Sequence, residues 1–499
     1  MTATAAALFL YLGVVTWIGI RSARRSSANV GEFYLGGRAM NELVVALSAV
    51  VSGRSAWLMM GMVGLTFVYG VRMAWFIPGY VAMELFLFLF AAPRIRRFTQ
   101  RHDDVTFIDY MASRFGDRTG VLRVVAAVIV VVFFTAYVGA QLKAGQVMFN
   151  MLFDWESVVA GIALMAAIVG FYTILGGFRA VSITDVIQAS LMILGLVVLP
   201  IVGFLHAGGF DEAWGKLEAV AAEEGSAFSL VAFGGLAGVV SGLGIGFGSP
   251  GNPHIIVRYR SIGRPERLRM AALVGTVWNV LLGWGAVYTG LAARALYAPS
   301  VLPDPKNQAF VHMATDLFPP FLAGLMLAAL VAAIMSTADS QLLVISSSIT
   351  RDVYEKVLRR GKPLDPRRAV TMGRVTTAVV IVLAALLSWI SSVAGKEGVF
   401  STVFSYVLLA WSGLGASFGP PLLLSHWWRR ATRAGALTSF VVGAATCILW
   451  VALGWKQATG IHEAVTGFVV STLAFVVVSL ATRPPPDAQA LLDAMEPEA

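Results

Sequence analysis

Five charged side chains stand within or close to long apolar segments of this sequence: Arg54, Glu84, Lys143, Asp185 and Asp339. A charge at the centre of a bilayer costs from roughly 3 to 17 kcal/mol, depending on how the cost is measured. Pairing the three acids with the two bases would leave one net negative charge. An acid without a partner at that depth needs a cation, a proton or a shifted pKa. These residues therefore indicate that ions or solutes are handled inside a membrane.

Asp339 lies in the stretch AAIMSTADSQ (332–341), where Ser336 and Thr337 place two hydroxyls in the middle of an apolar segment. Oxygen ligands without soft neighbours suit a small, hard cation rather than a transition metal. The same hydroxyls could instead bond to the carbonyl groups of the preceding helical turn. The sequence leaves both interpretations open.

The other three sites have structural alternatives of the same kind. Lys143 either extends towards the membrane surface, pairs with a carboxylate or contacts a solute. Asp185 either caps a helix or pairs with Arg179, or it handles an ion. Glu84 either pairs with Arg54 or carries a proton.

The elements that position these residues are predicted to be transmembrane helices. Of the 499 residues, 58% are hydrophobic and only 13% are charged, whereas a soluble domain carries about 25% charged residues. A spanning helix needs about 20 apolar residues, and runs of that length favour helices over barrel strands. The fold class is therefore an all-α polytopic membrane protein. The thirteen predicted spans are 2–20, 41–69, 73–93, 120–150, 156–175, 183–203, 228–250, 270–295, 317–348, 371–394, 400–424, 435–455 and 464–481.

The distribution of positive charge predicts the orientation. Most Lys and Arg residues fall in the segments that follow the odd-numbered spans. Cytoplasmic loops carry the excess of positive charge, so we expect a multi-pass protein of the cell membrane with its N-terminus outside and its C-terminus in the cytoplasm. The net charge of +9 is then topological and does not indicate nucleic-acid binding. The oligomeric state stays undetermined.

The predicted domain organisation is a transmembrane transport domain at 1–482 followed by a cytoplasmic tail at 483–499. The tail, RPPPDAQALLDAMEPEA, is polar and rich in proline, and we predict that it is disordered. The single cysteine, Cys447, excludes a disulfide within the chain.

Two of the predicted spans contain residues that interrupt helices. The second span has Ser52-Gly53 at its centre, and the seventh, at 233–253, holds eight glycines and two prolines. Each opens a set of five spans, which gives two repeats at about 41–203 and 228–424. An odd number of spans per set inverts the second repeat, as in secondary transporters that bind substrate and ions where broken helices meet. The alternative is that the glycines only allow close helix packing.

The sequence shows no enzyme constellation. Its six histidines have no metal-ligand spacing, and its one cysteine has no partner base nearby. No GxxxxGK[ST] motif is present, which argues against ATP-driven pumping. We expect a carrier that is not an enzyme and has no cofactor other than a coupling ion.

Several motifs spread along the chain resemble the sodium:solute symporter family, and most closely its sodium/proline branch. The resemblance implies ten core helices in two inverted repeats (a LeuT-like fold), alternating access, and solute uptake driven by sodium. The stretches that carry it are FYLGGRAMNELVVALSAVVSGRSAWLMMG (33–61), FFTAYVGAQLKAGQVMF (133–149), GGFRAVSITDVIQASLMI (176–193), GNPHIIVRY (251–259) and AAIMSTADSQLLVISSSITRDVY (332–354).

The resemblance also implies a sodium site and a solute pocket. It assigns sodium to main-chain oxygens and two hydroxyls, and it links Asp185 to sodium coupling. The implied ion ligands are Val51, Arg54, Ala333, Ser336, Thr337 and Asp185, and the implied solute-binding positions are Tyr137, Ile245, Ser249 and Pro253.

The chain departs from the branch in the second span. Gly53 stands where the branch has an aspartate, and Arg54 where it has an apolar residue. A like charge at about 4 Å repels a cation by roughly 4 kcal/mol at an effective dielectric of 20. If Arg54 points into the ion site, its guanidinium replaces sodium, and the carrier is sodium-independent or driven by protons through Glu84, Asp185 or Asp339. If Arg54 points away towards Glu84 or Asp339, its carbonyl still binds sodium.

The solute pocket departs as well. Ile245 and Ser249 replace two aromatic residues of the branch, so we expect the aromatic enclosure of a proline ring to be lost. The predicted function is secondary active import of a small polar solute, an amino acid or a carboxylate. The alternatives are a sodium-independent or proton-coupled carrier or exchanger, and a transporter-like sensor.

Overall fold

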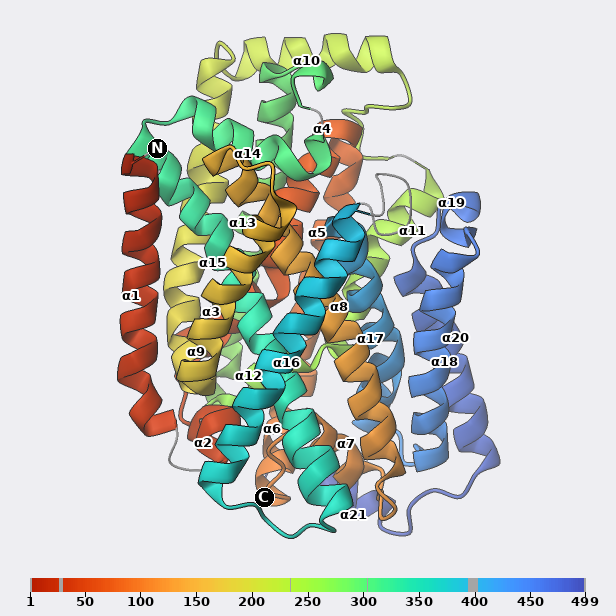
Figure 1. Ribbon diagram of the computed structural model, residues 1–499. Helices are drawn as coiled ribbons and strands as arrows, with labels where there is room; N and C mark the ends of the chain where they lie inside the picture. The colour runs from red at the N-terminus through yellow and green to blue at the C-terminus, as the bar shows by residue number, and fades with distance from the viewer. Residues whose placement is uncertain (1, 27–29, 234, 303, 394–402, 498–499) are drawn as a thin grey trace.

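The computed structural model describes residues 2–26, 30–233, 235–302, 304–393 and 403–497, and within them the regular secondary structure is helical. Eleven of the described helices are long and apolar enough to cross a membrane. Two shorter apolar helices, Val158–Ile174 and Leu236–Gly251, overlap the predicted fifth and seventh spans. The first is the part of α9 that precedes the non-helical residue Gly177. Figure 1 shows the long helices standing side by side, with the two chain ends at opposite ends of the bundle.

The helices of the described residues lie between Thr2 and Asp493. Their bounds are α1 (Thr2–Ser26), α2 (Val30–Leu35), η1 (Gly36–Arg38), α3 (Glu42–Ala56), η2 (Trp57–Met62), α4 (Val63–Tyr69), η3 (Val71–Trp75), α5 (Phe76–Phe86), η4 (Leu87–Ala91), α6 (Ala92–Arg101), α7 (Phe107–Arg114), α8 (Val121–Phe153), α9 (Val158–His206), α10 (Phe210–Glu224), α11 (Leu236–Gly244), η5 (Ile245–Gly251), α12 (Pro253–Ser261), η6 (Pro265–Arg267), α13 (Leu268–Leu296), η7 (Pro299–Val301), α14 (Pro305–Leu317), α15 (Pro320–Ser347), η8 (Ser348–Leu358), α16 (Pro366–Val393), α17 (Val403–Ser425), α18 (Arg433–Ala452), α19 (Trp455–Thr459), α20 (Glu463–Ala481) and α21 (Ala488–Asp493).

Both helices that were predicted to be interrupted are interrupted. In the second span the backbone leaves helical geometry at Ser55, with φ 29° and ψ −171°, two residues after Gly53. The seventh span changes from α11 into the 3₁₀ segment η5, which contains Pro250, before α12 begins at Pro253. Each break frees backbone carbonyl and N–H groups in the interior of the bundle, where they need partners.

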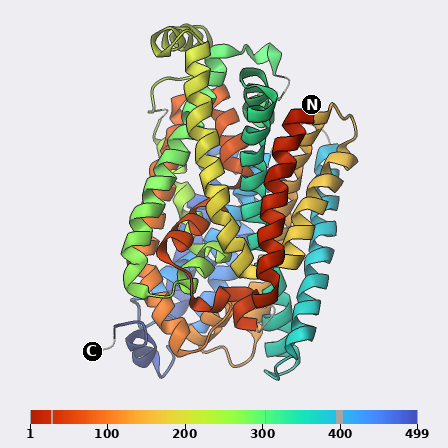
Figure 2. The ribbon, with the colours of Figure 1, turned by 90° about the vertical axis from the view of Figure 1, so that its left-hand side faces the viewer.

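Both breaks are buried inside the bundle. The span Glu42–Tyr69 is the most thoroughly buried of the eleven. Figure 2, turned by 90°, shows α1 at the outside of the bundle, and Figure 1 shows α18 and α20 at the opposite edge. The peripheral helices therefore shield the breaks from lipid.

The close approach of α17 to η5 depends on glycine. A Cβ added to Gly248 would lie 1.8 Å from Nε1 of Trp411 on α17, so any larger residue would displace the tryptophan. Glycine at this position lets the aromatic ring reach the 3₁₀ segment directly. The density of glycine in the seventh span thus serves packing as well as the break.

The segment 483–499, which was predicted to be disordered, forms the short helix α21 where the structure describes it. Leu491 and Met495 are buried. Two arginines of α6 bind the backbone of this segment: Arg97 donates to the carbonyl of Met495 at 3.4 Å, and Arg101 donates to that of Asp493 at 3.0 Å. The polar composition of the segment thus conceals two apolar side chains that find a buried surface.

Candidate functional site

Arg54, the last residue before the break in α3, is fully buried and points towards α5 and α13. Its Nη2 pairs with Oε1 of Glu84 on α5, and its Nε donates to Oδ1 of Asn279 on α13 at 2.8 Å. The guanidinium carbon lies 3.7 Å from the ring centre of Tyr80, a cation–π contact. Of the two directions that the sequence left open, the structure has the one that pairs Arg54 with Glu84.

Glu84 completes a ring of hydrogen bonds around this charge. Its Oε2 accepts from Nδ2 of Asn279 at 2.8 Å, and its Oε1 also accepts from Oγ of Ser249 on η5 at 3.2 Å. Removing one partner of a buried ion pair costs about 3–5 kcal/mol, because the remaining charge stays buried. Asn279 was not predicted from the sequence, because a lone amide in an apolar span carries no charge signal.

The two hydroxyls of α15 face the carbonyl groups that the break in α3 exposes. Oγ of Ser336 lies 3.4 Å from the carbonyl oxygen of Val51 and 3.2 Å from that of Ala333. Oγ1 of Thr337 lies 3.0 Å from the carbonyl oxygen of Ser52. The contact of Ser336 with Ala333 is the bond to the preceding turn that was the alternative interpretation. The arrangement is a cluster of hard oxygens from two helices, which we call the oxygen cluster.

The carbonyl of Arg54, another implied ion ligand, accepts the backbone N–H of Trp57 across the break. Ser52 also contributes to the oxygen cluster, since its Oγ donates to the carbonyl of Ser336 at 3.2 Å. The charge of Arg54 itself lies on the other side of the helix, where Glu84 neutralises it. Main chain and side chain of the same residue therefore face different neighbours.

Asp185 on α9 belongs to a second buried polar cluster. It accepts from Oγ of Ser48 at 2.5 Å and from Nη2 of Arg258 on α12 at 3.3 Å, so Arg258 rather than Arg179 is its partner. Arg258 also donates to Ser340. Ser340 in turn donates to Oδ1 of Asp339 at 3.1 Å.

This second cluster contains two carboxylates and one guanidinium. Oδ1 of Asp185 and Oδ2 of Asp339 have no hydrogen-bond partner within the described residues. Buried carboxylate oxygens without a donor indicate a proton or a cation. Arg258 was not predicted from the sequence, because the glycine-rich span before it was expected to end near residue 250.

Lys143 stands apart from both clusters. Its Nζ donates to Oγ of Ser391 on α16 at 2.9 Å. The contact joins α8 to α16 and gives this charge a polar neighbour inside the bundle.

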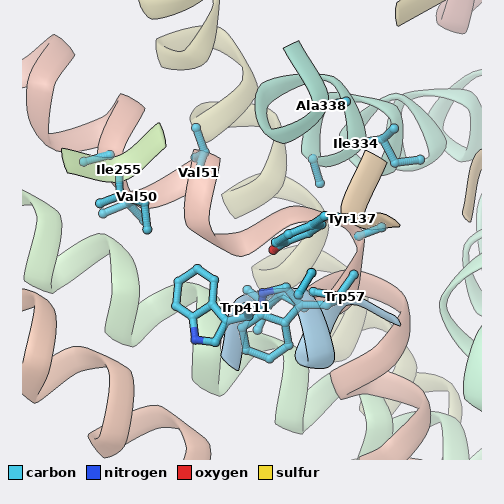
Figure 3. Packing of buried hydrophobic residues seen from close by; sticks show 14 of the residues in the cluster. Val50, Val51, Trp57, Tyr137, Ile255, Ile334, Ala338 and Trp411 are labelled. Atoms are coloured by element: carbon cyan, nitrogen blue, oxygen red, sulfur yellow. The ribbon is translucent and has the colours of Figure 1, made fainter. Parts of the chain in front are cut away.

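Aromatic side chains gather around the break in α3 (Figure 3). Oη of Tyr137 on α8 lies 3.5 Å from Oγ of Ser55, and Nε1 of Trp57 donates to the carbonyl of Gly53 at 3.1 Å. Nε1 of Trp411 donates to the carbonyl of Ile245 at 2.8 Å. Trp411, which comes from a helix outside the recognised motifs, thus places an aromatic ring beside Ile245.

The other predicted solute-binding positions divide between two places. Ile245 and Ser249 lie on η5 beside Trp411 and Glu84. Pro253 begins α12 and lines a narrow cavity together with residues of the second cluster. Residues 105–108, which include the start of α7, also line this cavity.

Gln141 is a further polar residue at the break that was not predicted from the sequence. Its Oε1 accepts the backbone N–H of Ala56 at 3.1 Å, which is the first amide after Ser55. Its Nε2 is buried and has no partner within the described residues. A buried amide donor without a partner beside a helix break is suited to a solute oxygen.

The profile of the sodium:solute symporter family matches residues 33–443, which is most of the chain. The chain belongs to the sodium:solute symporter family. It is a multi-pass membrane protein and a secondary active transporter, as the family and its relatives are. This confirms the resemblance, the fold class and the expectation of a carrier.

Three relatives of this symporter match nearly its whole length. The high-affinity proline transporter PutP of Bacillus subtilis (strain 168) is 36% identical over 474 residues, which cover 94% of this chain and 96% of the relative. The osmoregulated proline transporter OpuE of the same strain is 35% identical, with 96% and 94% covered. The sodium/proline symporter of Staphylococcus aureus (strain JH9) is 35% identical, with 95% and 92% covered.

Solved structures with low sequence identity share the fold of the symporter. A Na⁺-coupled sialic acid symporter in a substrate-bound outward-open state superposes with a TM-score of 0.76 at 17% identity, covering 97% of this chain and 98% of that chain. Mhp1, a nucleobase-cation-symport-1 family transporter in a closed conformation, gives 0.56 at 14% identity, with 93% and 98% covered. Both likenesses concern the fold alone.

Proposed function

We propose that this symporter imports a small amino acid of the proline type together with sodium, with its N-terminus outside the cell and its C-terminus in the cytoplasm. Relatives that cover almost the whole chain carry proline transport in their names. The observation that carries sodium coupling is the position of the Ser336 and Thr337 hydroxyls, which face the carbonyls of Val51 and Ser52. The two inverted repeats, at about 41–203 and 228–424, would place the oxygen cluster at the midplane.

The direction of the Arg54 side chain supports sodium coupling. A guanidinium aimed into the oxygen cluster would repel a cation there by roughly 4 kcal/mol. Instead, Arg54 is paired with Glu84, bonded to Asn279 and stacked on Tyr80. The pair is neutral as a unit, so its charge would not repel a monovalent cation from the cluster. Asp185 would contribute through the adjoining cluster.

The proline-type solute is proposed on the aromatic and polar groups at the break. Trp411 and Trp57 offer apolar faces to a pyrrolidine ring, and Tyr137 lies between them and α15 (Figure 3). The unpartnered Nε2 of Gln141 would donate to the solute carboxylate. Arg54 and Lys143 are both engaged by other residues. In this proposal the solute carboxylate is therefore bound by the Gln141 amide rather than by a charged side chain.

A second candidate is a carrier driven by protons. It is favoured by the unpartnered oxygens of Asp185 and Asp339, which share the single guanidinium of Arg258. One proton on this cluster would balance its charge. Such a carrier would need no sodium at Ser336 and Thr337.

Uptake into proteoliposomes separates the two candidates. Radiolabelled proline would be offered with an inward sodium gradient, a proton gradient, or potassium in place of sodium. We expect accumulation above equilibrium with sodium alone, and its loss in the variant that combines Ser336→Ala with Thr337→Ala. Accumulation with the proton gradient and no sodium would favour the second candidate. Uptake that never exceeds equilibrium would indicate a carrier without ion coupling.

A further inference from the structure

The carboxylate of Glu84 touches both interrupted helices at once. One of its oxygens accepts from Arg54, at the break in α3, and from Ser249, in the 3₁₀ segment of η5. Its other oxygen accepts from Asn279, which also holds Arg54. Arg54, Glu84 and Asn279 thus bond to one another in a closed ring, and Ser249 joins it through Glu84. We call these four side chains the Glu84 ring, and all of them are almost fully buried.

The members of the Glu84 ring come from one group of helices. Arg54 belongs to α3, Glu84 to α5, Ser249 to η5 and Asn279 to α13. A second group of helices faces α3. It contributes Tyr137 on α8, Asp185 on α9 and Ser336 on α15. The hydrogen bonds of the ring therefore bind the first group together without fastening it to the second.

This division matters for alternating access. In inverted-repeat transporters, one group of helices rocks against the other around the central site. The oxygen cluster contains carbonyls of α3, whereas the solute-binding positions Ile245 and Ser249 lie on η5. An ion held at α3 affects η5 if the two breaks form one rigid unit.

We propose that Glu84 is a positioning residue that makes the two broken helices respond together, so that an ion bound between α3 and α15 also orders the solute-binding segment η5. This inference rests on the proposed sodium site. It gives the buried pair a role other than replacing the ion. A charged carboxylate is suited to the role because it accepts from three donors with strong, directional bonds.

The test is hydrogen exchange of backbone amides with sodium as the probe and no solute. Sodium is compared with potassium at equal ionic strength. A cation bound at about 100 times its dissociation constant slows exchange from the states that it must close by up to about 100-fold. In the wild type we expect slower exchange at residues 52–57 and also at 245–252, although the implied ligands of the oxygen cluster lie on α3 and α15 alone.

The decisive variant combines Arg54→Gln with Glu84→Gln, which removes both charges and leaves no buried charge without a partner. We expect sodium to slow exchange at 52–57 but no longer at 245–252. A matched control combines Lys456→Gln with Glu463→Gln, which removes another ion pair at 3.0 Å, between α19 and α20. The control should keep both responses. Glu84→Asp, which retains the charge, should restore part of the response at 245–252.

Each outcome decides the matter in one direction. If 245–252 responds to sodium equally in the double variant, the Glu84 ring does not link the breaks and the inference is wrong. If neither segment responds in the wild type, the sodium site itself is absent, and the proposed function fails together with the inference. A loss of response at both segments in the double variant alone would show that the ring builds the ion site rather than transmitting its occupation, which also overturns the inference.

Discussion

Arg258 on α12 contacts Asp185 on α9 at 3.3 Å, and through Ser340 it is linked to Asp339 on α15. One guanidinium thus serves two buried carboxylates from two other helices. Its loss would leave both acids without a cation, whereas loss of one acid would leave a balanced pair. The asymmetry makes the cluster testable by single substitutions.

We expect Arg258→Met to destabilise the protein by about 3–5 kcal/mol, because it leaves uncompensated buried charge. Asp339→Asn should be much milder, since Arg258 then pairs with Asp185 alone. Thermal unfolding in detergent measures both. A similar loss for both variants would mean that Asp339 is itself essential to the balance of charge.

Ser336→Ala with Thr337→Ala should abolish stabilisation by sodium. A cation held only by the folded state at about 100 times its dissociation constant adds roughly 2.7 kcal/mol. The unfolding midpoint in sodium, compared with potassium, should therefore rise for the wild type and stay unchanged for the double variant. Ser347→Ala serves as the matched control, because this hydroxyl lies on the same helix but outside the oxygen cluster and donates to the carbonyl of Val344. An equal sodium effect in the double variant would refute the assignment of the Ser336 and Thr337 hydroxyls.

Arg54→Ala should lower stability without creating a new sodium response. The substitution leaves Glu84 buried with Asn279 and Ser249 as its remaining donors, at a cost of about 3–5 kcal/mol. If Arg54 instead occupied the place of the ion, its removal would make sodium stabilising for the first time. The unfolding midpoint of wild type and variant in sodium and in potassium separates the two.

Asp104, between α6 and α7, should make stability depend on pH. Burial raises the pKa of its carboxyl to about 6, opposed by the hydrogen bond from Ser113. The folded state then binds the proton more tightly than the unfolded state, so this stability is fully present below about pH 4 and is lost as the pH rises through about 6. Over the whole window the loss is of the order of 3 kcal/mol, from about 1.4 kcal/mol per pKa unit.

The measurement is the unfolding midpoint between pH 4 and pH 8 for the wild type and for Asp104→Asn. The variant carries no titrating group there, so its curve should be flatter and its midpoint at pH 8 higher. Asp103→Asn, at the neighbouring and largely exposed position, is the matched control and should leave the curve unchanged. A pH profile that is the same for Asp104→Asn and wild type would contradict the prediction.

Much of the architecture is determined locally. The apolar runs require helices in lipid, since backbone groups must find partners within their own segment. The interruptions at Ser55 and in η5 follow from residues that break helices, and the two hydroxyls in MSTADS lie together because they are adjacent in sequence. Such features depend on neighbours a few residues apart, which the sequence displays directly.

Only the tertiary structure decided the directions and partners of the buried charged side chains. Glu84 is 30 residues from Arg54 and Asn279 is 225 residues away, so no periodicity within the second span reveals the direction of the Arg54 side chain. The aromatic ring of Trp411 reaches Ile245 across 166 residues. A buried charge takes its partner from whichever helix packs beside it. The residue types alone therefore required that Arg54 be neutralised, and only the packing of α5 and α13 against α3 decided that Glu84 and Asn279 do so and that the oxygen cluster lies on the other side.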